Sequence, residues 1–590
     1  MKTRPELGAE PTSQGTRFAC YADATSSSVR LLDESGAELS RHELTLLGDG
    51  FFEAVVREAR EGTLYDLCLD GRCLPDPYAR YLPKGVHGPA MVLRKRRPER
   101  PAEKQLPLSE QVIYELHVGT FTREGTFAAA AERLPYLVEL GVTTVELMPL
   151  AAFSGARGWG YDGVALFAPH AAYGTPDDLA NFVARAHELG LLVWLDVVYN
   201  HFGPSGNYLG AYSKHYFRED LHNAWGQAPN FELPAFRDLV LGNARYWLEE
   251  FGFDGLRLDA THALLDPSPR HILLELTELA HSLRPHRVVV AEDERNEASL
   301  VTKFGLDGVW ADDFHHQARV TLTHEREGYY AAFEPSVRDL SRTIQQGWLY
   351  TGQTNPVSKL PRGTPATDLL AEQFVYCIQN HDQIGNRALG ERLSTSIPPN
   401  AYRMVSLLLL FLPMTPMLFM GQEWGARTPF LYFTDHDPEL GKLVSEGRRR
   451  EFAGFSQFKD ESAREKIPDP QAESTFAASR LDWSERENEE SGRTLDLYRR
   501  ALALRKTDPV LTHSGRKQLL ARANGQVLVV ERWFGPEART LLVNFGDSER
   551  KLAELGVVGE TRRLLESEPS PHSEVLPGLS ALLLAGVRQT

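Results

Sequence analysis

The fold of this chain is decided by the stretch Gly255-Leu256-Arg257-Leu258-Asp259-Ala260-Thr261-His262, which reads as a short apolar strand ending on a carboxylate. Side chains alternate along a strand, so Arg257 and Asp259 are expected to point to the same side. The positive charge of Arg257 favours the ionised form of Asp259. An ionised, oriented carboxylate is what a nucleophile toward the anomeric carbon of a sugar must be. A purely structural Arg–Asp pair explains the octapeptide equally well, so both interpretations stay open here.

Three further stretches have the same form, an apolar run that ends in polar or charged groups. They are Leu192-Val193-Trp194-Leu195-Asp196-Val197-Val198-Tyr199-Asn200-His201, Val288-Val289-Val290-Ala291-Glu292-Asp293-Glu294 and Phe374-Val375-Tyr376-Cys377-Ile378-Gln379-Asn380-His381-Asp382. In this order, the four stretches resemble the four signature regions of the α-amylase superfamily of glycoside hydrolases (glycoside hydrolase family 13). The resemblance implies that Asp259 is the nucleophile, Glu292 the general acid and base, and Asp382 a third carboxylate that binds sugar hydroxyls and supports the transition state.

After residue 110, strand-like and helix-like segments alternate, which is typical of parallel strands joined by helices. Amphipathic helices are predicted over Phe127–Leu140 and Pro176–Leu189. Eight strands indicate an α/β fold, the closed (β/α)8 or TIM barrel. They are Ile113–His117, Thr144–Met148, Leu192–Val197, Gly255–Asp259, Val288–Ala291, Gly308–Ala311, Phe374–Gln379 and Pro416–Phe419. The chemistry of such barrels lies at the carboxyl ends of the strands, and Asp259, Glu292 and Asp382 fall at those ends of strands four, five and seven.

Three domains are predicted, with a linker between the first two. Residues 1–92 show short alternating segments between turns, which favour an N-terminal β-sandwich, and the resemblance implies a starch-binding-like module there. Residues 93–110 are a charged linker, and residues 111–511 form the catalytic barrel. Within it, the excursion 202–237 is long enough to be functional, and the resemblance implies that it walls the sugar cleft. Residues 512–590 return to a β pattern and are expected to form a small C-terminal antiparallel domain.

Composition and charge argue against several functional classes. The 64 Lys and Arg residues against 80 Asp and Glu give a formal net charge of −16, which argues against nucleic acid or an anionic membrane as partner. The start of the chain lacks the apolar run of a signal peptide. The apolar stretch Met404–Met420 contains two prolines, which favour a helix, a turn and a buried strand over a membrane span. A cytoplasmic location is therefore expected, with free thiols at Cys20, Cys68, Cys73 and Cys377, although Cys68 and Cys73 could approach each other.

Several side chains near the signature regions are candidates for sugar binding. Tyr161 and Asp162 lie in a glycine-rich segment, where an aromatic ring and a carboxylate suit the apolar face and the hydroxyl rim of a pyranose. The resemblance implies that this pair holds the sugar at the point of cleavage and that His201 and His381 hydrogen-bond it. Asn200 matches a calcium ligand of the α-amylases, but the remaining ligands cannot be picked out. No metal and no cofactor is therefore predicted.

Segments outside the four regions resemble one family within the superfamily, the maltooligosyltrehalose trehalohydrolases, over nearly the whole chain. They are Pro75–Pro89, Ala291–Asn296, Trp310–His316, His381–Arg387 and Tyr432–Leu440. The resemblance implies a retaining hydrolase that cleaves the α-1,4 bond next to the terminal trehalose of an α-glucan oligosaccharide. Trehalose presents hydroxyls on all sides, so its pocket needs many fixed donors and acceptors.

The substrate-binding set that follows from these motifs is large. It comprises Trp159, Tyr161, Asp162, His201, Arg257, Leu258, Ala260, Thr261, His262, Asp293, Arg295, Asn296, Asp313, Phe314, His315, His316, His381, Gln383, Ile384, Gly385 and Asn386. Asp293, Arg295, Asn296, Asp313 and His316 are the candidates for recognising trehalose, because they follow strands five and six.

Two alternatives remain open at this point. A 1,4-α-glucan branching enzyme, or another α-amylase-type glucanase, would share the fold and the three carboxylates, and the branching enzyme would transfer to a sugar hydroxyl instead of water. A non-catalytic glucan-binding or transporter-associated relative would typically have lost catalytic carboxylates, and this chain keeps all three. Product analysis on a trehalose-capped maltooligosaccharide separates these alternatives.

Overall fold

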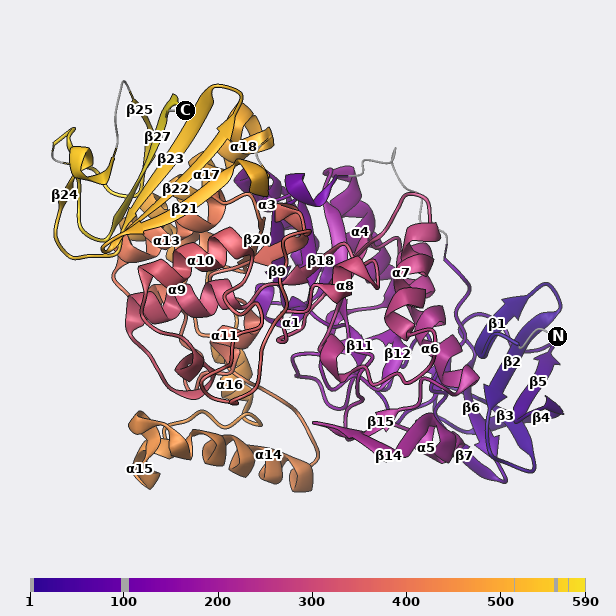
Figure 1. The fold of residues 1–590 in the computed structure, drawn as a ribbon. Coiled ribbons are helices and arrows are strands. Elements are labelled where there is room, and N and C mark those ends of the chain that lie inside the picture. The colour runs from indigo at the N-terminus through magenta and orange to yellow at the C-terminus, as the bar shows by residue number, and fades with distance from the viewer. Residues whose placement is uncertain (1–4, 97–105, 514, 557–560, 571, 589–590) are drawn as a thin grey trace.

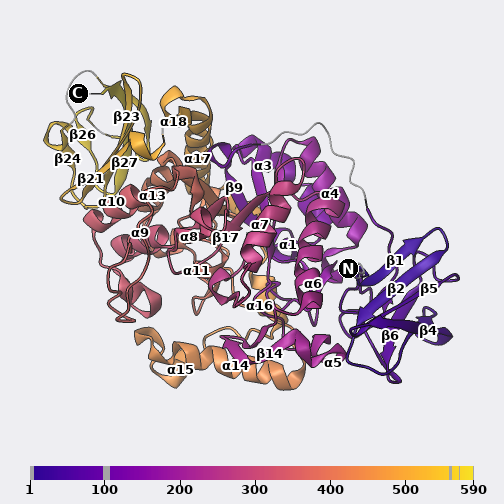
Figure 2. The same cartoon turned by 45° about the vertical axis from the view of Figure 1, so that its right-hand side comes forward.

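A closed barrel of eight parallel strands forms the centre of the molecule, in the order β10-β13-β16-β17-β18-β19-β20-β9. The computed structural model describes residues 5–96, 106–513, 515–556, 561–570 and 572–588. Figures 1 and 2 show the N-terminal and C-terminal sheets on opposite sides of the barrel. The barrel strands are β9 (Ile113–Leu116), β10 (Thr144–Leu147), β13 (Leu192–Val197), β16 (Gly255–Leu258), β17 (Val288–Ala291), β18 (Gly308–Trp310), β19 (Phe374–Tyr376) and β20 (Thr415–Phe419). The predicted barrel is confirmed.

The register between neighbouring strands brings distant parts of the sequence together. β16 pairs in parallel with β13, where Arg257 lies opposite Asp196, and with β17, where the last residues of the two strands are paired. Asp259 and Glu292 directly follow those two last residues. The two carboxylates therefore leave adjacent strands side by side, at the end of the barrel where chemistry is expected.

Helices surround the barrel and fill its loops. Those that pack around the strands are α2 (Phe127–Ala131), α3 (Leu134–Leu140), α4 (Pro176–Glu188), α6 (Pro234–Arg245), α7 (Ile272–Ser282), α8 (Ser299–Thr302), α9 (Asp313–Thr323), α10 (Val337–Gln346), α13 (Pro399–Phe411) and α17 (Glu489–Thr507). Shorter or peripheral helices are α1 (Val118–Phe121), α5 (Leu209–Tyr212), α11 (His381–Gly385), α12 (Leu393–Ser396), α14 (Pro438–Glu451), α15 (Glu461–Arg464), α16 (Glu473–Ala478) and α18 (Pro509–His513). The helix predicted over Pro176–Leu189 is confirmed as α4, which begins with a capping box between Thr175 and Asp178.

The helix predicted over Phe127–Leu140 is one correction, because the structure divides it into α2 and α3. Pro135 occupies the first turn of α3. A proline has no backbone N–H and its ring clashes with the carbonyl one turn earlier, so it cannot continue α2 and instead starts a new helix.

The N-terminal domain is a β-sandwich made from one folded sheet, in the order β1-β2-β5-β4-β3-β6-β7, with β8 paired to β6. The long strand β4 pairs with β3 along its first part and with β5 along its last, and so joins the two layers. Phe18 from β2 meets Tyr65 from β6 edge to face across the core, with ring centroids 4.9 Å apart. The strands are β1 (Gly8–Thr12), β2 (Gly15–Tyr21), β3 (Ser27–Leu32), β4 (Glu38–Gly48), β5 (Phe51–Val56), β6 (Leu64–Leu69), β7 (Arg72–Leu74) and β8 (Ala90–Met91).

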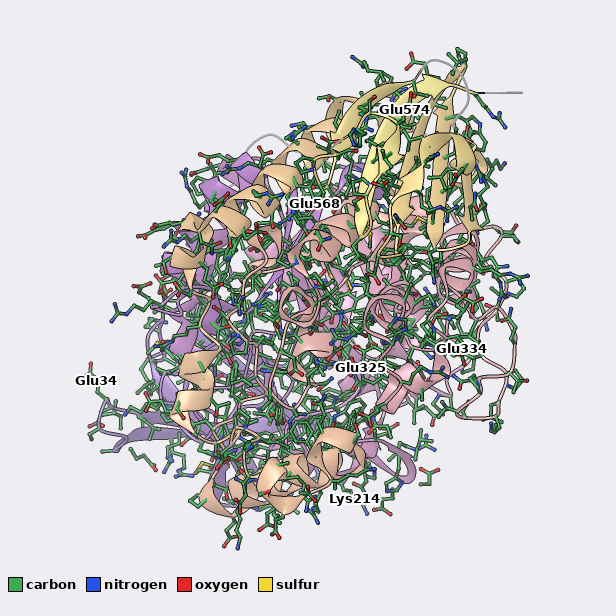
Figure 3. All side chains as sticks on the ribbon, turned by 90° about the vertical axis from the view of Figure 1, so that its left-hand side faces the viewer. Glu34, Lys214, Glu325, Glu334, Glu568 and Glu574 are labelled. Carbon is green, nitrogen blue, oxygen red and sulfur yellow. A yellow bond between two sulfur atoms is a disulfide. The ribbon has the colours of Figure 1, made fainter. Side chains whose placement is uncertain are left out.

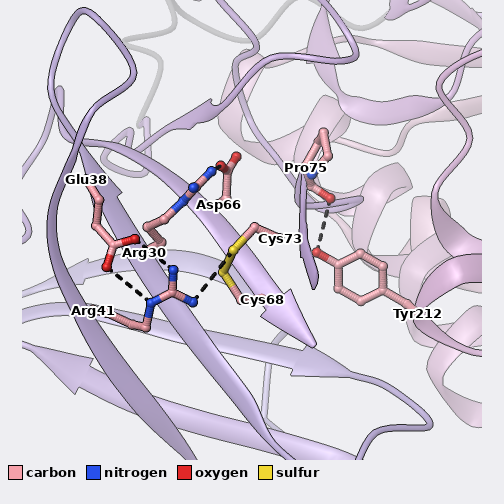
Figure 4. Close-up of a disulfide and its surroundings, with 8 residues drawn as sticks. All are labelled: Arg30, Glu38, Arg41, Asp66, Cys68, Cys73, Pro75 and Tyr212. Atoms are coloured by element: carbon pink, nitrogen blue, oxygen red, sulfur yellow. Dashed lines mark hydrogen bonds and ion pairs between the residues drawn. A yellow bond between two sulfur atoms is a disulfide. The ribbon is translucent and has the colours of Figure 1, made fainter. Parts of the chain in front are cut away.

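The prediction of free thiols is wrong for two of the four cysteines. Cys68 and Cys73 form a disulfide (Figure 4), whereas Cys20 and Cys377 are buried and free. The cause is the antiparallel hairpin of β6 and β7, which places Cys68 directly opposite Cys73 with their Cα atoms 3.8 Å apart. Spacing alone indicated only that the two could approach each other.

The excursion after β13 contains α5 and a two-stranded hairpin, β14 (Phe217–Asn223) and β15 (Gly226–Pro229), before α6 begins at Pro234. The N-terminal domain contacts this segment directly. The Tyr212 hydroxyl donates to the carbonyl of Pro75 at 3.0 Å (Figure 4), and the Ser213 hydroxyl donates to Asp23 at 2.7 Å. The sandwich therefore braces the segment that was predicted to wall the sugar site. A second small sheet joins β11 (Ala151–Ala152) to β12 (Ala165–Pro169).

The C-terminal domain is an antiparallel sheet, in the order β21-β22-β23-β27-β25, with the pair β24 and β26 beside it. Arg532 of β22 is buried and donates to the carbonyl of Phe411, the last residue of α13. Glu568 pairs with Arg403 of α13, and Figure 3 shows it where the sheet meets the helices. The strands are β21 (Leu519–Asn524), β22 (Val527–Phe534), β23 (Glu537–Asn544), β24 (Arg550–Lys551), β25 (Arg562–Glu566), β26 (Val575–Leu576) and β27 (Ser580–Val587).

Among the described residues, no helix has both the length and the apolar character needed to cross a membrane. The apolar stretch Met404–Met420 divides into the end of α13 and the buried strand β20, as predicted.

Candidate active site at the carboxyl end of the barrel

Arg257 is the centre of the candidate site, because one buried guanidinium contacts several carboxylates. Its Nη1 donates to Asp259 Oδ1 and to both oxygens of Asp196, each at 2.8 Å. Its Nη2 lies 3.7 Å from Glu292 Oε2. The side chain is fully shielded from solvent, and its flat face lies 4.3 Å from the ring centre of Trp310. The predicted Arg257–Asp259 contact is therefore present, and the same cation also reaches the neighbouring strand.

Asp259 is held in its ionised form. Burial alone would raise the pKa of Asp259, but the charge of Arg257, followed by His201 and a hydrogen bond from Asn200, outweighs burial and leaves that pKa below its usual value. Asn200 Nδ2 donates to Asp259 Oδ2 at 2.9 Å and to its carbonyl at 2.8 Å. These contacts fix both oxygens of the carboxylate and its orientation.

Glu292 has the opposite electrostatic environment. Burial raises its pKa well above the usual value, and the negative charges of Asp259, Asp312 and Asp382 add to the effect, while Arg257 opposes it. Glu292 Oε2 accepts the backbone N–H of Ala260 at 2.7 Å. Two adjacent carboxyl groups with pKa values pushed apart are the arrangement needed for one ionised and one protonated partner.

Ala260 holds a strained backbone between the two carboxylates. Its φ of 41° lies in the left-handed region, which costs a residue with a Cβ atom free energy. That conformation turns the chain directly after β16 and aims the N–H of Ala260 at Glu292. The sequence gives no sign of this turn, because alanine has no preference for it.

A chain of hydrogen bonds connects the first and seventh strands of the barrel through His381. His381 Nδ1 lies 2.5 Å from Glu115 Oε1, and its Nε2 lies 2.8 Å from the Tyr161 hydroxyl. Tyr161 in turn donates to Asp196 Oδ2 at 2.6 Å. Burial disfavours a charged His381, but Asp382 and Glu115 outweigh it and raise its pKa to about 9. His381 is therefore a fixed cation whose ring also stacks on Tyr161, with centroids 5.2 Å apart.

Three carboxylates that the sequence reasoning did not select lie inside the barrel, on β9, β10 and β13. Glu115, Glu146 and Asp196 are each at most 2% exposed. Burial raises the pKa of Asp196 to about 6, despite Arg257, and raises that of Glu146 well above its usual value. The signal for them was present, because each is a single carboxylate inside an otherwise apolar strand, where an acidic side chain is rarely buried without a purpose.

His201 was predicted to bind the sugar, but both of its nitrogens already have partners within the protein. Nε2 donates to the carbonyl of Tyr161 at 2.9 Å, and Nδ1 contacts the amide oxygen of Asn200. Its ring stacks almost parallel on Trp225, with centroids 4.2 Å apart. Trp225 lies in the turn between β14 and β15, is 50% exposed, and was missed by the sequence reasoning. A half-exposed tryptophan in a long excursion was the available signal.

Asn200, which matches a calcium ligand of the α-amylases, also has a protein partner at each end of its side-chain amide. Asn200 directs its amide nitrogen to Asp259 and its amide oxygen to His201. The side chain therefore orients the carboxylate in this structure rather than presenting its oxygen to an ion.

Asn296 and Asp313, predicted to read sugar hydroxyls, are buried and bonded to each other. Asn296 Nδ2 donates to Asp313 Oδ2 at 2.7 Å, and the backbone N–H groups of Leu349 and Tyr350 donate to the same oxygen. Arg362 Nη2 lies 3.0 Å from the other oxygen. The geometry favours a supporting role, in which Asp313 holds the loop after α10.

Arg295 differs, because half of its side chain is exposed. Its Nε and Nη2 donate to Asp293 at 2.8 and 2.6 Å, and Asp293 also accepts the Thr261 hydroxyl at 2.7 Å. Nη1 has no hydrogen-bond partner within the described part of the chain. Asp293 and Thr261 are buried, so they fix the guanidinium without reaching solvent themselves.

The remaining predicted residues divide by exposure. Trp159 is packed in the wall, where its Nε1 donates to the carbonyl of Leu431 and any Cβ at Gly385 would lie 2.1 Å from its ring. The other buried residues are Leu258, Ala260, Phe314, His315, His316, Gln383 and Ile384. His262 and Asp162 are half-buried, and Asn386 is exposed, with its Nδ2 donating to Asp382 Oδ1 at 3.3 Å. Asp382 is the most open of the three carboxylates, with 37% of its side chain exposed against 12% for Asp259 and 14% for Glu292.

Comparisons with known proteins place this chain in a family. The alpha amylase catalytic domain family matches residues 109–220. The malto-oligosyltrehalose trehalohydrolase of Deinococcus radiodurans is 49% identical over 99% of this chain and 96% of its own length. The enzyme of the same name from Rhizobium sp. (strain M-11) is 38% identical over 99% of this chain and 100% of its own length. The chain belongs to the malto-oligosyltrehalose trehalohydrolase family.

A solved structure is similar to this chain over almost its whole length. A Salmonella typhimurium protein, provisionally described as an alpha amylase, has a TM-score of 0.90 at 35% identity. The match covers 98% of this chain and 99% of that one. The similarity therefore includes both flanking β domains as well as the barrel.

Proposed function

We propose that this member of the trehalohydrolase family is a retaining glycoside hydrolase that cleaves the α-1,4 bond next to the terminal trehalose of maltooligosyltrehalose. The proposal rests on one observation, the two carboxyl groups that share Arg257 and whose pKa values are displaced in opposite directions. Asp259 is the nucleophile, and Glu292 protonates the leaving oxygen and then activates water. Asp382 binds sugar hydroxyls. The names of the relatives supply the substrate. A cytoplasmic location and a role in trehalose biosynthesis are further expectations, supported by the resemblance.

The binding roles follow from exposure and free bonding capacity. Tyr161 and Asp162, both partly exposed, present a ring and a carboxylate on one side of the position where the sugar reacts. His381 is buried, and both of its nitrogens contact protein groups, so it positions the Tyr161 ring. Arg295 has a free Nη1 and a guanidinium fixed by Asp293. It is therefore the candidate for hydrogen-bonding trehalose hydroxyls. A site built to hydrogen-bond particular hydroxyls rejects ligands that leave those groups unpaired.

The first experiment tests the reaction. Asp259→Asn removes the nucleophile with little change in volume, and kcat should fall by at least about a thousandfold. Wild-type enzyme with a trehalose-capped maltooligosaccharide should release trehalose and, by NMR, an α-anomer at the newly formed reducing end. Retention of more than about a tenth of kcat in the variant would contradict the assignment of the nucleophile. A β-anomer as first product, or new α-1,6 branches, would contradict the reaction type.

The second experiment tests selectivity with matched substrates, a maltooligosaccharide with and without the trehalose cap. The Arg295→Ala variant should lose at least about tenfold of the preference for the capped substrate, because one charged hydrogen bond is removed. Cleavage of the uncapped substrate should survive. Arg185→Ala, an exposed arginine paired with Glu188 on α4, serves as control and should keep the preference. Equal loss on both substrates would assign Arg295 a structural role instead.

A further inference from the structure

The amino end of the barrel carries a cluster of two histidines and an aspartate that the proposed function does not use. His281 lies in the last turn of α7, His286 lies just before β17, and Asp307 lies just before β18. The catalytic carboxylates follow the opposite ends of such strands. A full strand length therefore separates this cluster from the active site.

The donor atoms of the cluster converge on one point. His281 Nε2 lies 3.0 Å from Asp307 Oδ2, and His286 Nε2 lies 3.2 Å from Asp307 Oδ1. All three donor atoms lie within 4.8 Å of one another. Ligands of a tetrahedral or octahedral ion with bonds of about 2.0–2.2 Å stand about 3 to 3.5 Å apart. The two imidazole rings are stacked, with centroids 4.0 Å apart, so both present the same edge to the carboxylate.

The cluster is open to an ion from solution. The side chains of His281, His286 and Asp307 are 29%, 43% and 20% exposed. His286 and Asp307 also line a cavity of about 660 Å³ at this end of the barrel. Solvent molecules could complete the coordination of an ion that has three protein ligands.

A second His–Asp contact at the same end of the barrel is an example of such a contact with a purely structural role. His187 Nε2 lies 2.8 Å from Asp254 Oδ2, and that oxygen accepts a backbone N–H from β13 at 2.9 Å. Asp307 repeats this pattern, because its Oδ2 contacts His281 and accepts a backbone N–H from β17 at 2.8 Å. Both aspartates precede the glycine that starts a barrel strand.

The two His–Asp contacts differ in the group that lies next to the other oxygen of the aspartate. The other oxygen of Asp254 has Arg287 Nη1 at 3.8 Å, whereas the other oxygen of Asp307 has His286. A guanidinium has no lone pair to offer a metal, whereas a neutral imidazole is a common metal ligand. Of these two arrangements, only the one around Asp307 therefore offers three possible metal ligands.

We propose that His281, His286 and Asp307 bind one divalent transition-metal ion at the amino end of the barrel. Two imidazoles and a carboxylate suit Zn²⁺, Cu²⁺ or Ni²⁺ and do not suit Mg²⁺ or Ca²⁺, which prefer oxygen ligands. The ion connects the end of α7 to the starts of β17 and β18. It takes no part in the hydrolysis proposed above, and the inference does not depend on that proposal.

The test uses the full chain without an affinity tag, treated with a chelator and titrated calorimetrically with Zn²⁺ at neutral pH. Wild type should bind one Zn²⁺ per chain at this site. His286→Ala should weaken binding by at least about tenfold, because a ligand is lost. His187→Gln, which alters the matching contact at Asp254, should bind like wild type. Both variants should keep wild-type kcat.

Crystals soaked in Zn²⁺ locate the ion independently, by an anomalous peak between the three donor atoms. Unchanged affinity in His286→Ala, a peak elsewhere, or no saturable binding in wild type would each overturn the proposal. An equal loss of affinity in His187→Gln would also overturn it, because general destabilisation would then explain the effect.

Discussion

Arg257 explains how two adjacent carboxyl groups take opposite protonation states. It bonds directly to Asp259 and lies farther from Glu292, at 2.8 and 3.7 Å. The interaction of opposite charges weakens with distance, so the same cation lowers the pKa of the nearer group more effectively. On Glu292, burial together with the negative charges of Asp259, Asp312 and Asp382 outweighs the opposing charge of Arg257, and the pKa rises.

The pH profile offers a test of this electrostatic arrangement. A general acid must be protonated, so kcat/KM should fall as pH rises through the pKa of Glu292. Asp312 is one of the groups that raise that pKa. Asp312→Asn should therefore shift the basic limb of the profile to lower pH, by up to about one unit, because one negative charge is removed.

The control for this measurement is Glu294→Gln, which changes an exposed carboxylate close to Glu292 in the sequence. Its basic limb should coincide with that of wild type. The acidic limb, set by Asp259, should stay in place in both variants. A basic limb of Asp312→Asn that stays fixed or moves to higher pH would show that Asp312 does not act on Glu292.

At the residue scale, sequence motifs placed three carboxylates after the ends of barrel strands, but they did not show which neighbouring polar groups bond to each other inside the protein. Asp259 and Glu292 could be placed because a strand-end position follows from the pattern of apolar residues. Asn296 and Asp313 follow strand ends in the same way, yet they bond to each other and to the backbone. The position of a residue in a motif does not show whether its polar group bonds to another group inside the protein. That distinction requires the structure.

At the element scale, the hairpin of β14 and β15 brings an aromatic face to the site. Trp225 lies at its turn and stacks on His201. Trp225→Ala should raise KM by about two- to tenfold with little change in kcat, the effect expected from the loss of one aromatic stacking surface. Trp225→Phe keeps a ring and should restore most of the affinity. Steady-state kinetics on one trehalose-capped substrate measure both variants, and an unchanged KM in Trp225→Ala would exclude a contact with the sugar.

Features that depend on the local sequence were predicted better than features that depend on how strands pair. All eight barrel strands were located, because parallel strands buried on both faces read as apolar runs. The break between α2 and α3 also had a local cause, Pro135, which was overlooked. The Cys68–Cys73 disulfide and the left-handed turn at Ala260 depend on hairpin register and on the neighbouring strand. No local pattern specifies those.

At the scale of the whole molecule, buried arginines attach the C-terminal sheet to the barrel. Arg532 donates to the carbonyls of Phe411 and Leu511 from a position that is 1% exposed. Arg532→Met should lower the free energy of unfolding of the first transition by about 3 kcal/mol, because two buried carbonyls lose their donor. The catalytic constants should change little, since Arg532 is remote from the candidate active site.

Thermal and denaturant unfolding of the full chain measure this effect. The matched control is Arg562→Met, an exposed arginine on β25 of the same sheet, which should unfold like wild type. The first transition is the relevant quantity, because a chain with three domains need not unfold in one step. If the first unfolding transition has the same midpoint in wild type and in Arg532→Met, other contacts hold the sheet.

The hydrogen bond between Glu115 and His381 has a consequence for biosynthesis. Glu115 lies on the first barrel strand to leave the ribosome, and His381 follows the seventh. The eighth strand, β20, contains none of the three carboxylates proposed to react, but it pairs with both β9 and β19 and closes the ring. A nascent chain that ends before Thr415 already holds Asp259, Glu292 and Asp382, yet it lacks the strand that brings Glu115 to His381. We therefore expect a nascent chain to become active only after β20 has been synthesised, although β20 carries none of these three carboxylates.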